Sequence, residues 1–144
     1  MNFEGSLKKD EKFKMWVAEI PAFDVMTQGD SVEQTLEMIK GTINELLLDM
    51  FSEKAKEVKL ETAHVSDDGF ELRSNNTKLL ISLALRRQRE AAGLTIKEVT
   101  ERLGASSINY YAQYERGRIS ISIEMLEKLL VAVNPKSPRR LKIV

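Results

Sequence analysis

The sequence predicts two joined domains, an α+β domain over residues 1–75 and an all-α domain over residues 76–144. Two observations lead to this prediction. Strand-like segments surround one long helical pattern in the first part, whereas apolar residues recur only at helical spacing from Asn76 onward. The charge also changes sign, because residues 1–76 carry a net charge of about −7 and residues 77–144 a net charge of about +7.

The first domain is expected to contain a small antiparallel sheet. KFKMWVAEI at 12–20 is rich in β-prone residues and ends at Pro21, and DVMTQ at 24–28 forms a second short strand before Gly29. A weaker strand is expected at residues 3–8. The three segments follow one another with short connections, which favours antiparallel neighbours.

A second hairpin is expected later in the first domain. EVKLETAHV at 57–65 and FELR at 70–73 flank the segment SDDG. Gly69 is available there for the positive φ that such turns require. The predicted order is therefore three strands, a helix and one strand, with a fifth strand from this hairpin.

One amphipathic helix is expected between these strands. Asp30 and Ser31 offer an N-cap, and Gln34 is placed to complete a capping box with Ser31. The helix is expected to run for about five turns. Its apolar face consists of Val32, Leu36, Ile39, Ile43, Leu46, Leu47 and Met50.

The second domain is expected to contain four helices, because caps and stops alternate along it. Residues that can cap a helix start are Asn76 or Thr77, Thr95 with Glu98 in a capping box, Ser106 or Ser107, and Ser122. Glycines that can end a helix are Gly93, Gly104 and Gly117. The third helix is expected to end at about Glu115 and the last at Asn134. A short helix, a glycine-containing turn and a short helix form the helix-turn-helix arrangement.

The third helix of this domain has two different faces. Tyr111 and Tyr114 are three positions apart, so they share one face and are expected to pack on Val99 and Leu103 of the preceding helix. Asn and Gln side chains offer adenine a paired donor and acceptor, and arginines bind phosphates. The candidate DNA-binding residues are Ser106, Ser107, Asn109, Tyr110, Gln113, Arg116 and Arg118. A capped surface helix also carries polar residues without binding DNA, and that alternative stays open.

The segment LTIKEVTERLGASSINYYAQYERGR, followed by SIEMLEKLLVAV, resembles the Cro-like helix-turn-helix of phage repressors, over residues 78–133. In that family the recognition helix ends at a Glu separated by one residue from Gly, which here are Glu115 and Gly117. The resemblance implies base contacts from Ile108, Asn109 and Gln113, with Ser107 in the turn.

The segment MWVAEIPAFDVMTQGDSVEQTLEMIKGTINELLLD resembles the HicB antitoxins, and the likeness covers about residues 3–73. It implies a partial ribonuclease H fold and a partner, a small basic HicA ribonuclease, which the HicB domain blocks while the complex represses its own operon. Candidate hydrophobic contacts to that toxin are Phe13, Trp16, Phe23 and Met26, although aromatic residues in such a strand are more often core.

Several function classes are disfavoured. Cysteine is absent and His64 is the single histidine, which excludes disulfides, thiolate chemistry and histidine clusters. Glu4, Glu19 and Asp24 are the carboxylates of the strand region, and no spacing makes them converge on a metal. We therefore expect no enzyme, metal or cofactor. No apolar run approaches a membrane span and no signal peptide is recognisable, so a cytoplasmic protein is expected.

A homodimer or higher homo-oligomer is expected, because one recognition helix reads only a few base pairs of a two-fold symmetric operator. Its axis is expected on a strand edge of the sheet or on the last helix, where Ile123, Leu126 and Leu130 exceed what a small core needs. The alternative to an antitoxin is a stand-alone helix-turn-helix regulator whose first domain dimerises or senses a ligand. The C-terminal tail adds Lys136, Arg139, Arg140 and Lys142 as a phosphate-touching arm or a solvated end.

Overall fold

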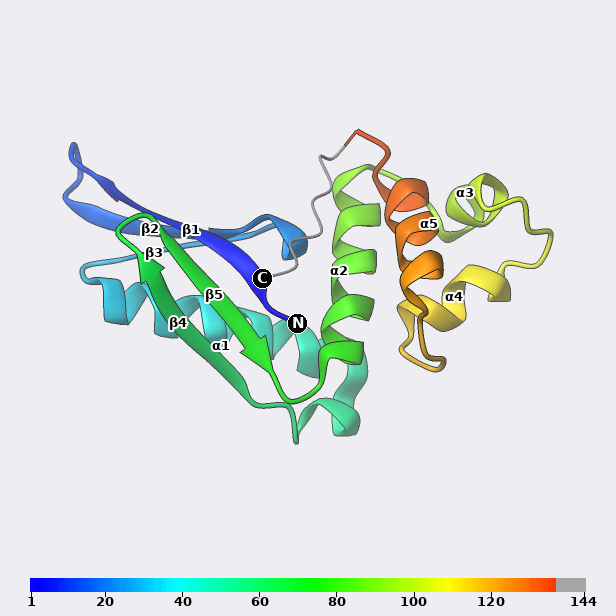
Figure 1. Cartoon of the computed structure of the whole chain (residues 1–144), viewed down its shortest axis with the longest axis horizontal. Coiled ribbons are helices and arrows are strands. Elements are labelled where there is room, and N and C mark those ends of the chain that lie inside the picture. The colour runs from blue at the N-terminus through cyan, green and yellow to red at the C-terminus, as the bar shows by residue number, and fades with distance from the viewer. Residues whose placement is uncertain (137–144) are drawn as a thin grey trace. The chain divides into compact units, whose positions relative to one another are not determined.

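A computed structural model describes residues 1–136, and Arg139, Arg140 and Lys142 of the basic tail lie outside them. Backbone contacts divide the chain into an N-terminal unit, Met1–Ala84, and a C-terminal unit that begins at Leu85. The first contains an antiparallel sheet with a helix and the second is helical, so the predicted fold class is confirmed (Figure 1). The domain boundary expected near residue 76 coincides with the start of a helix that continues into the second unit.

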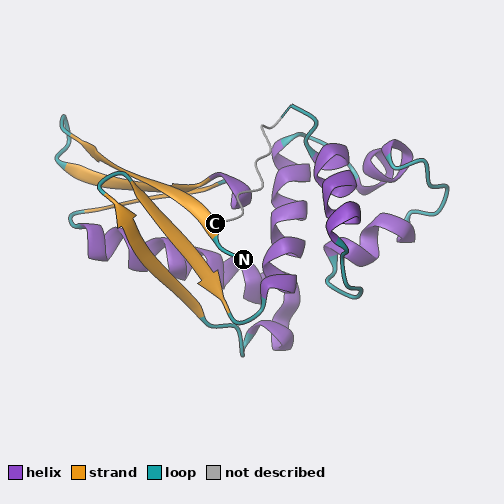
Figure 2. Cartoon of the chain, viewed as in Figure 1, coloured by secondary structure: helices purple, strands orange, loops and turns teal. Residues whose placement is uncertain are grey.

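The N-terminal unit contains one five-stranded sheet in the order β3-β2-β1-β5-β4, with every neighbouring pair antiparallel (Figure 2). Its strands are β1 (Phe3–Asp10), β2 (Met15–Ile20), β3 (Val25–Gly29), β4 (Leu60–Ser66) and β5 (Gly69–Ser74). All five predicted strands are therefore present. The strand expected from residue 12 begins later, because residues 11–14 form the turn after β1 and Lys14 has a φ of 52° there.

The prediction for Gly69 was wrong. Gly69 does not have a positive φ, since the glycines that do, within residues 1–136, are Gly93, Gly104 and Gly117. The hairpin instead turns at residues 67–68, and a register shift between His64 and Ser66 accommodates it.

Helix α1 (Val32–Phe51) runs along one face of the sheet (Figure 1) and contacts β2, β3 and β4. The Ser31 hydroxyl caps it by accepting the Gln34 backbone N–H at 3.1 Å, as predicted. The reciprocal half of the predicted capping box is absent, because the Gln34 side chain accepts the backbone N–H of Asp30 at 2.7 Å instead. Gln34 therefore binds Asp30, the residue before the N-cap, and not Ser31 itself.

The core of the N-terminal unit lies between the sheet and the helices. Strand residues on the inner face, such as Leu7, Ile20 and Leu72, are fully buried together with Ile39 and Ile43 of α1. The first half of helix α2 (Thr77–Ala91) adds its own residues to the same core, namely Leu79, Leu80, Leu83 and Ala84. This packing explains why the start of α2 groups with the sheet.

The C-terminal unit contains the second half of α2 and three further helices. These are α3 (Ile96–Arg102), α4 (Asn109–Glu115) and α5 (Ile123–Val133). The capping box of Thr95 and Glu98 is confirmed, with hydrogen bonds of 2.7 and 3.1 Å, and Ser122 caps α5. The start predicted for α4 at Ser106 or Ser107 was wrong, because Ile108 occupies the N-cap position and no side chain caps the helix.

Candidate functional site

The turn between α3 and α4 places the second short helix against the first. Gly104 has a φ of +73°, which is left-handed backbone that glycine adopts without strain. The Ala105 N–H then donates to the Thr100 carbonyl at 3.1 Å and closes the end of α3. Residues 103–108 make up the connection, and α3 and α4 are in contact.

The inner face of α4 is buried, as the sequence predicts for Tyr111 and Tyr114. Tyr111 is 0% exposed and Tyr114 is 8% exposed, and Ala112 between them is also buried. Val99, which was expected to face them from α3, is fully buried, whereas Leu103 is half-buried. The face of α4 that turns toward the solvent is thereby fixed.

A buried ion pair holds the end of α4 to the end of α2. Arg89 donates to both carboxylate oxygens of Glu115, from Nε at 2.9 Å and from Nη2 at 2.7 Å, and Nη1 donates to the Leu94 carbonyl at 2.8 Å. Their side chains are 12% and 6% exposed. The hydrogen bond to Glu115 raises the pKa of Arg89 above its usual value, against the opposing effect of burial. Arg89 therefore stays charged, and its two hydrogen bonds to Glu115 hold the end of α4 against α2.

Sequence reasoning missed this pair. Glu115 was noted only as the last residue of the recognition helix. The two positions are 26 residues apart, so no helical spacing connects them. The available signal was that Glu115 is the only acidic residue between residues 102 and 123.

The Tyr111 hydroxyl lies near this pair and has no hydrogen-bond partner in residues 1–136. Burial, followed by the negative charge of Glu115, raises the pKa of Tyr111 far above its usual value. Burial and the neighbouring Tyr110 also raise the pKa of Tyr114. Both side chains therefore remain neutral at physiological pH and act as apolar packing elements.

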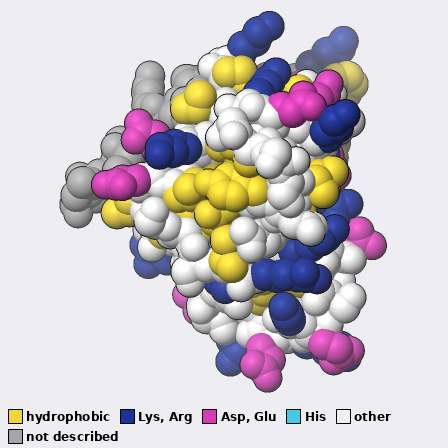
Figure 3. All heavy atoms as spheres, turned by 90° about the vertical axis from the view of Figure 1, so that its right-hand side faces the viewer, with side chains coloured by type: hydrophobic (Ala, Val, Ile, Leu, Met, Phe, Trp, Pro, Cys, Tyr) yellow, Lys and Arg dark blue, Asp and Glu magenta, His cyan; other side chains and the backbone are white. Residues whose placement is uncertain are grey.

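The outer side of the turn and α4 exposes the candidate DNA-binding residues. Exposed side chains there are Ser106, Ser107, Asn109, Tyr110, Arg116 and Arg118. Gln113 is half-buried, and its side-chain amide donates weakly to the Tyr110 carbonyl at 3.4 Å. Within residues 1–136 neither Arg116 nor Arg118 forms an ion pair, so both guanidinium groups are available to an anion. Seen from the side of α3 and α4, hydrophobic side chains gather at the centre of this face, and lysines, arginines and several acidic side chains lie around them (Figure 3).

The last helix is anchored at its C-terminal end. Arg102 of α3 donates to the Ala132 carbonyl at 3.1 Å, and the Asn134 amide donates to Gln88 of α2 at 2.9 Å. Leu129 and Val133 are fully buried. Ile123 at the opposite end is 77% exposed, while Leu126 and Leu130 are half-buried, which leaves an apolar strip along α5.

The candidate toxin contacts of the N-terminal unit separate into three groups. Phe23 is 0% exposed and packs its ring 4.8 Å from that of Phe3, so the structure corrects this candidate to a core residue. Trp16 is half-buried against the core. Met26 on β3 and Phe13 in the turn after β1 are 62% and 66% exposed. Only the last two present large apolar surface to a partner.

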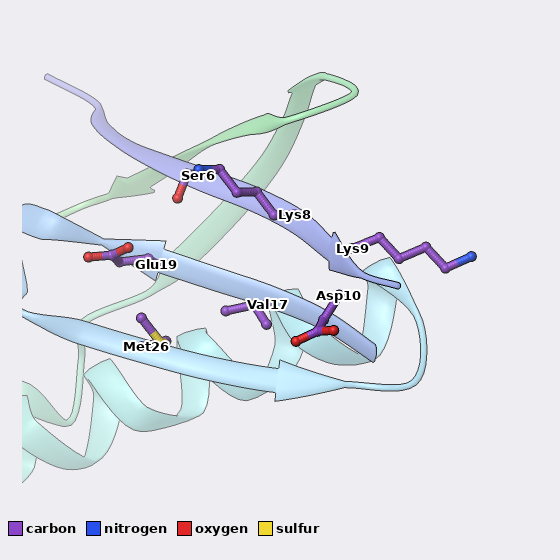
Figure 4. A pocket seen from close by; sticks show the side chains of 7 residues that line it. All are labelled: Ser6, Lys8, Lys9, Asp10, Val17, Glu19 and Met26. Atoms are coloured by element: carbon purple, nitrogen blue, oxygen red, sulfur yellow. The ribbon is translucent and has the colours of Figure 1, made fainter. Parts of the chain in front are cut away.

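The outer face of β1, β2 and β3 carries a shallow depression of about 310 Å³ (Figure 4). It is lined by Ser6, Lys8, Lys9, Asp10, Val17, Glu19 and Met26. Strand register explains the arrangement, because Ser6 pairs with Glu19 and Glu19 with Met26, which aligns the three across neighbouring strands. Within residues 1–136 no three His, Cys, Asp or Glu side chains are grouped to hold a metal ion. Among the same residues, no helix has the length and apolarity needed to cross a membrane.

Comparison with known families identifies the C-terminal unit. Residues 85–141 match the family described as helix-turn-helix. A comparison with curated proteins found no match. The matched range contains the second half of α2 together with α3, α4, α5 and the Arg89–Glu115 pair. The predicted helix-turn-helix is confirmed, and this match supports a DNA-binding regulator.

Proposed function

We propose that the protein is a cytoplasmic antitoxin of the HicB type, which neutralises a HicA-type mRNA-cleaving ribonuclease and represses its own operon by sequence-specific DNA binding. The observation that carries this proposal is the attachment of an acidic α+β unit, with one open sheet face, to a basic helix-turn-helix domain. The division of labour is between residues 1–75, which bind toxin, and residues 76–144, which bind DNA.

The open sheet face is the proposed toxin-binding surface. It combines the exposed thioether of Met26 with the carboxylate of Glu19 on the neighbouring strand (Figure 4). Glu4 and Glu71 pair across β1 and β5 and extend this face by alternation along the strands. Apolar contact from Met26, flanked by carboxylates, suits a partner that is basic and partly apolar.

Electrostatics favours such a partner. A ribonuclease that holds RNA carries positive charge on its RNA-binding surface, and the N-terminal part of this chain has a net charge of about −7. Complementary charge accelerates encounter and disfavours wrong partners. Carboxylates on the sheet would compete with RNA phosphates for the same basic surface, which makes neutralisation a direct consequence of binding.

In the C-terminal domain, α4 is the proposed recognition helix. Asn109 and Gln113 would present amides to adenine in the major groove, with Ser106, Ser107 and Tyr110 beside them. Arg116 and Arg118, which follow the C-terminal end of α4, would bind phosphates. The Arg89–Glu115 pair supports this proposal, because it holds the C-terminal end of α4 against α2.

A homodimer is part of the proposal, since two recognition helices would read the two halves of a symmetric operator. The surfaces available for it are the apolar strip of Ile123, Leu126 and Leu130 on α5 and the two sheet edges, at β3 and at β4. Light scattering on the full chain, with Ile123→Glu as the variant, distinguishes the α5 strip from a sheet edge. Dimerisation through α5 predicts a smaller species for this variant, and dimerisation through a sheet edge predicts no change.

The toxin-binding proposal is tested in cells that produce the toxin encoded beside this chain. Wild-type chain should restore growth, whereas Glu19→Arg combined with Met26→Arg should fail to restore it while still binding operator DNA. Glu45→Arg, an exposed charge reversal on α1, is the matched control and should restore growth. If the double variant restored growth as well as wild type does, the sheet face would not be the toxin-binding surface.

The second candidate function is a stand-alone regulator whose N-terminal unit senses a small ligand. The depression on the sheet favours this second function, because a cation, a carboxylate and a hydroxyl line it, from Lys8, Glu19 and Ser6. The partner distinguishes the two functions, since an antitoxin requires a tightly bound small basic protein. A regulator of this kind would bind its operator alone and respond to a charged small molecule.

A further inference from the structure

Ile108 is an exposed aliphatic residue at a position where polar residues are the rule. It is 50% exposed and occupies the position immediately before α4. Ser, Thr, Asp and Asn are preferred at such positions, because their side-chain oxygens accept a backbone N–H of the first turn. Isoleucine has no such oxygen, and no cap hydrogen bond forms. Neither helix stability nor core packing therefore explains this side chain.

A second exposed apolar group lies two residues further along. Tyr110 is 38% exposed, and its ring meets that of Tyr114 edge-on, with centroids 6.2 Å apart and an interplanar angle of 78°. Tyr114 is buried, so this contact restrains the Tyr110 ring. Ile108 and Tyr110 are the large apolar residues exposed on the turn and α4, the region viewed in Figure 3.

The major groove offers one apolar group on an unmodified base edge, the C5-methyl of thymine. Carboxylates, which accept from the amino group of cytosine, are absent from residues 103–114. The polar side chains that α4 carries after Ile108 are instead the amides of Asn109 and Gln113, which suit adenine. The side chains on this surface therefore match the two partners of an A·T base pair.

We propose that Ile108 contacts a thymine C5-methyl group in each half-site and is a specificity-determining residue. The proposal rests on the sequence-specific DNA binding proposed above. Asn109 and Gln113 would read adenine beside this thymine, so each half-site is rich in A·T pairs. The contribution of Ile108 comes from removing the methyl group and the exposed side chain from water together.

The experiment compares thymine with deoxyuridine, which differs only in lacking the methyl group. The full chain first selects sequences from a pool of random duplexes of about 25 base pairs, long enough for two half-sites one helical turn apart. Each thymine of the selected duplex is then replaced in turn by deoxyuridine, and Kd is measured by fluorescence anisotropy. Loss of one methyl contact should raise Kd about 4-fold, and loss of both symmetric contacts about 15-fold.

The variant that tests the residue is Ile108→Ala, with Leu48→Ala on α1 as the matched truncation of an exposed aliphatic side chain. Ile108→Ala should bind thymine and deoxyuridine duplexes equally well, while Leu48→Ala and Ile108→Val should keep the preference for thymine. Circular dichroism of each variant verifies that it is folded.

Two results would overturn the inference while leaving DNA recognition intact. One is a selected operator in which no thymine responds to deoxyuridine. The other is a thymine preference that survives in Ile108→Ala. Failure to enrich any sequence would instead overturn the proposed sequence-specific repression, and with it this inference.

Discussion

Replacing Glu115 with Gln should strongly destabilise the C-terminal domain. The change keeps the size of the side chain but removes the charge that faces Arg89, whose side chain is only 12% exposed. Removing one partner of a buried ion pair typically costs about 3–5 kcal/mol. We expect about 3 kcal/mol, because Arg89 keeps its hydrogen bond to the Leu94 carbonyl. A urea slope of about 1 kcal/mol/M for a domain this small converts this loss to a midpoint lower by about 3 M.

The assay follows urea unfolding by near-ultraviolet circular dichroism of the tyrosines, all three of which lie in α4, with Trp16 fluorescence as the report on the N-terminal unit. Glu124→Gln, an exposed position on α5, is the control and should leave the midpoint unchanged. Arg89→Met combined with Glu115→Gln should recover part of the loss, since it removes the uncompensated charge. If the urea midpoint of the tyrosine signal for Glu115→Gln lay within about 0.5 M of wild type, the reasoning would be refuted. A shift that small corresponds to the stability that an exposed ion pair contributes.

Three further predictions concern DNA binding and pH. Asn109→Ala with Gln113→Ala should abolish preference for the operator over random DNA in anisotropy measurements but leave toxin neutralisation intact; loss of both functions would contradict the two-domain division. Nuclear magnetic resonance should find the pKa of Glu98 below its usual value, because the Thr95 backbone N–H and hydroxyl stabilise the carboxylate. The stability that this cap contributes is present above the pKa of Glu98 in the unfolded chain and is lost as pH falls through its pKa in the folded chain. An ordinary pKa for Glu98 would contradict the cap. Because the pKa of Tyr111 is raised in the folded chain, its contribution to stability is fully present below the unfolded pKa of about 10 and is lost as pH rises above that value. Between about pH 9 and 11 the urea midpoint should therefore fall less for Tyr111→Phe than for wild type. Midpoints that fall in parallel for the two proteins would contradict the raised pKa.

Short-range signals in the sequence predicted the helix boundaries well. The capping box of Thr95 and Glu98 spans three residues, and both of its hydrogen bonds are present. Gly93, Gly104 and Gly117 all adopt the positive φ expected after a helix. These features depend on neighbours within one helical turn, so the sequence contains all the information that determines them.

Features that depend on distant partners were predicted less well. The pairing of Arg89 with Glu115 joins two helices through the fold, and neither residue indicates the other. Phe23 was grouped with surface candidates because exposed and buried aromatic residues look alike in a strand-rich segment, and only packing against Phe3 separates them. Gly69 was assigned a left-handed turn that the register shift near Ser66 made unnecessary.

Candidate DNA-binding residues could be predicted from the sequence because a helix-turn-helix confines them to one short segment. The turn and α4 expose Ser106, Asn109 and Arg116 as that spacing requires. The start of α4 was misplaced, since Ile108 lacks the capping chemistry that sequence analysis looks for. In the N-terminal unit the outer sheet face combines residues of three strands, and Glu19 acquires its neighbours Ser6 and Met26 only through strand register.

The most direct test of the antitoxin account is to capture the tagged full chain from extracts of its native cells and identify what accompanies it. The account predicts one small basic protein in stoichiometric amount, which cleaves RNA once it is separated from the chain and stops doing so when the chain is added back. Capture of the chain alone, still able to bind its operator, would contradict the antitoxin function and leave a self-sufficient DNA-binding regulator.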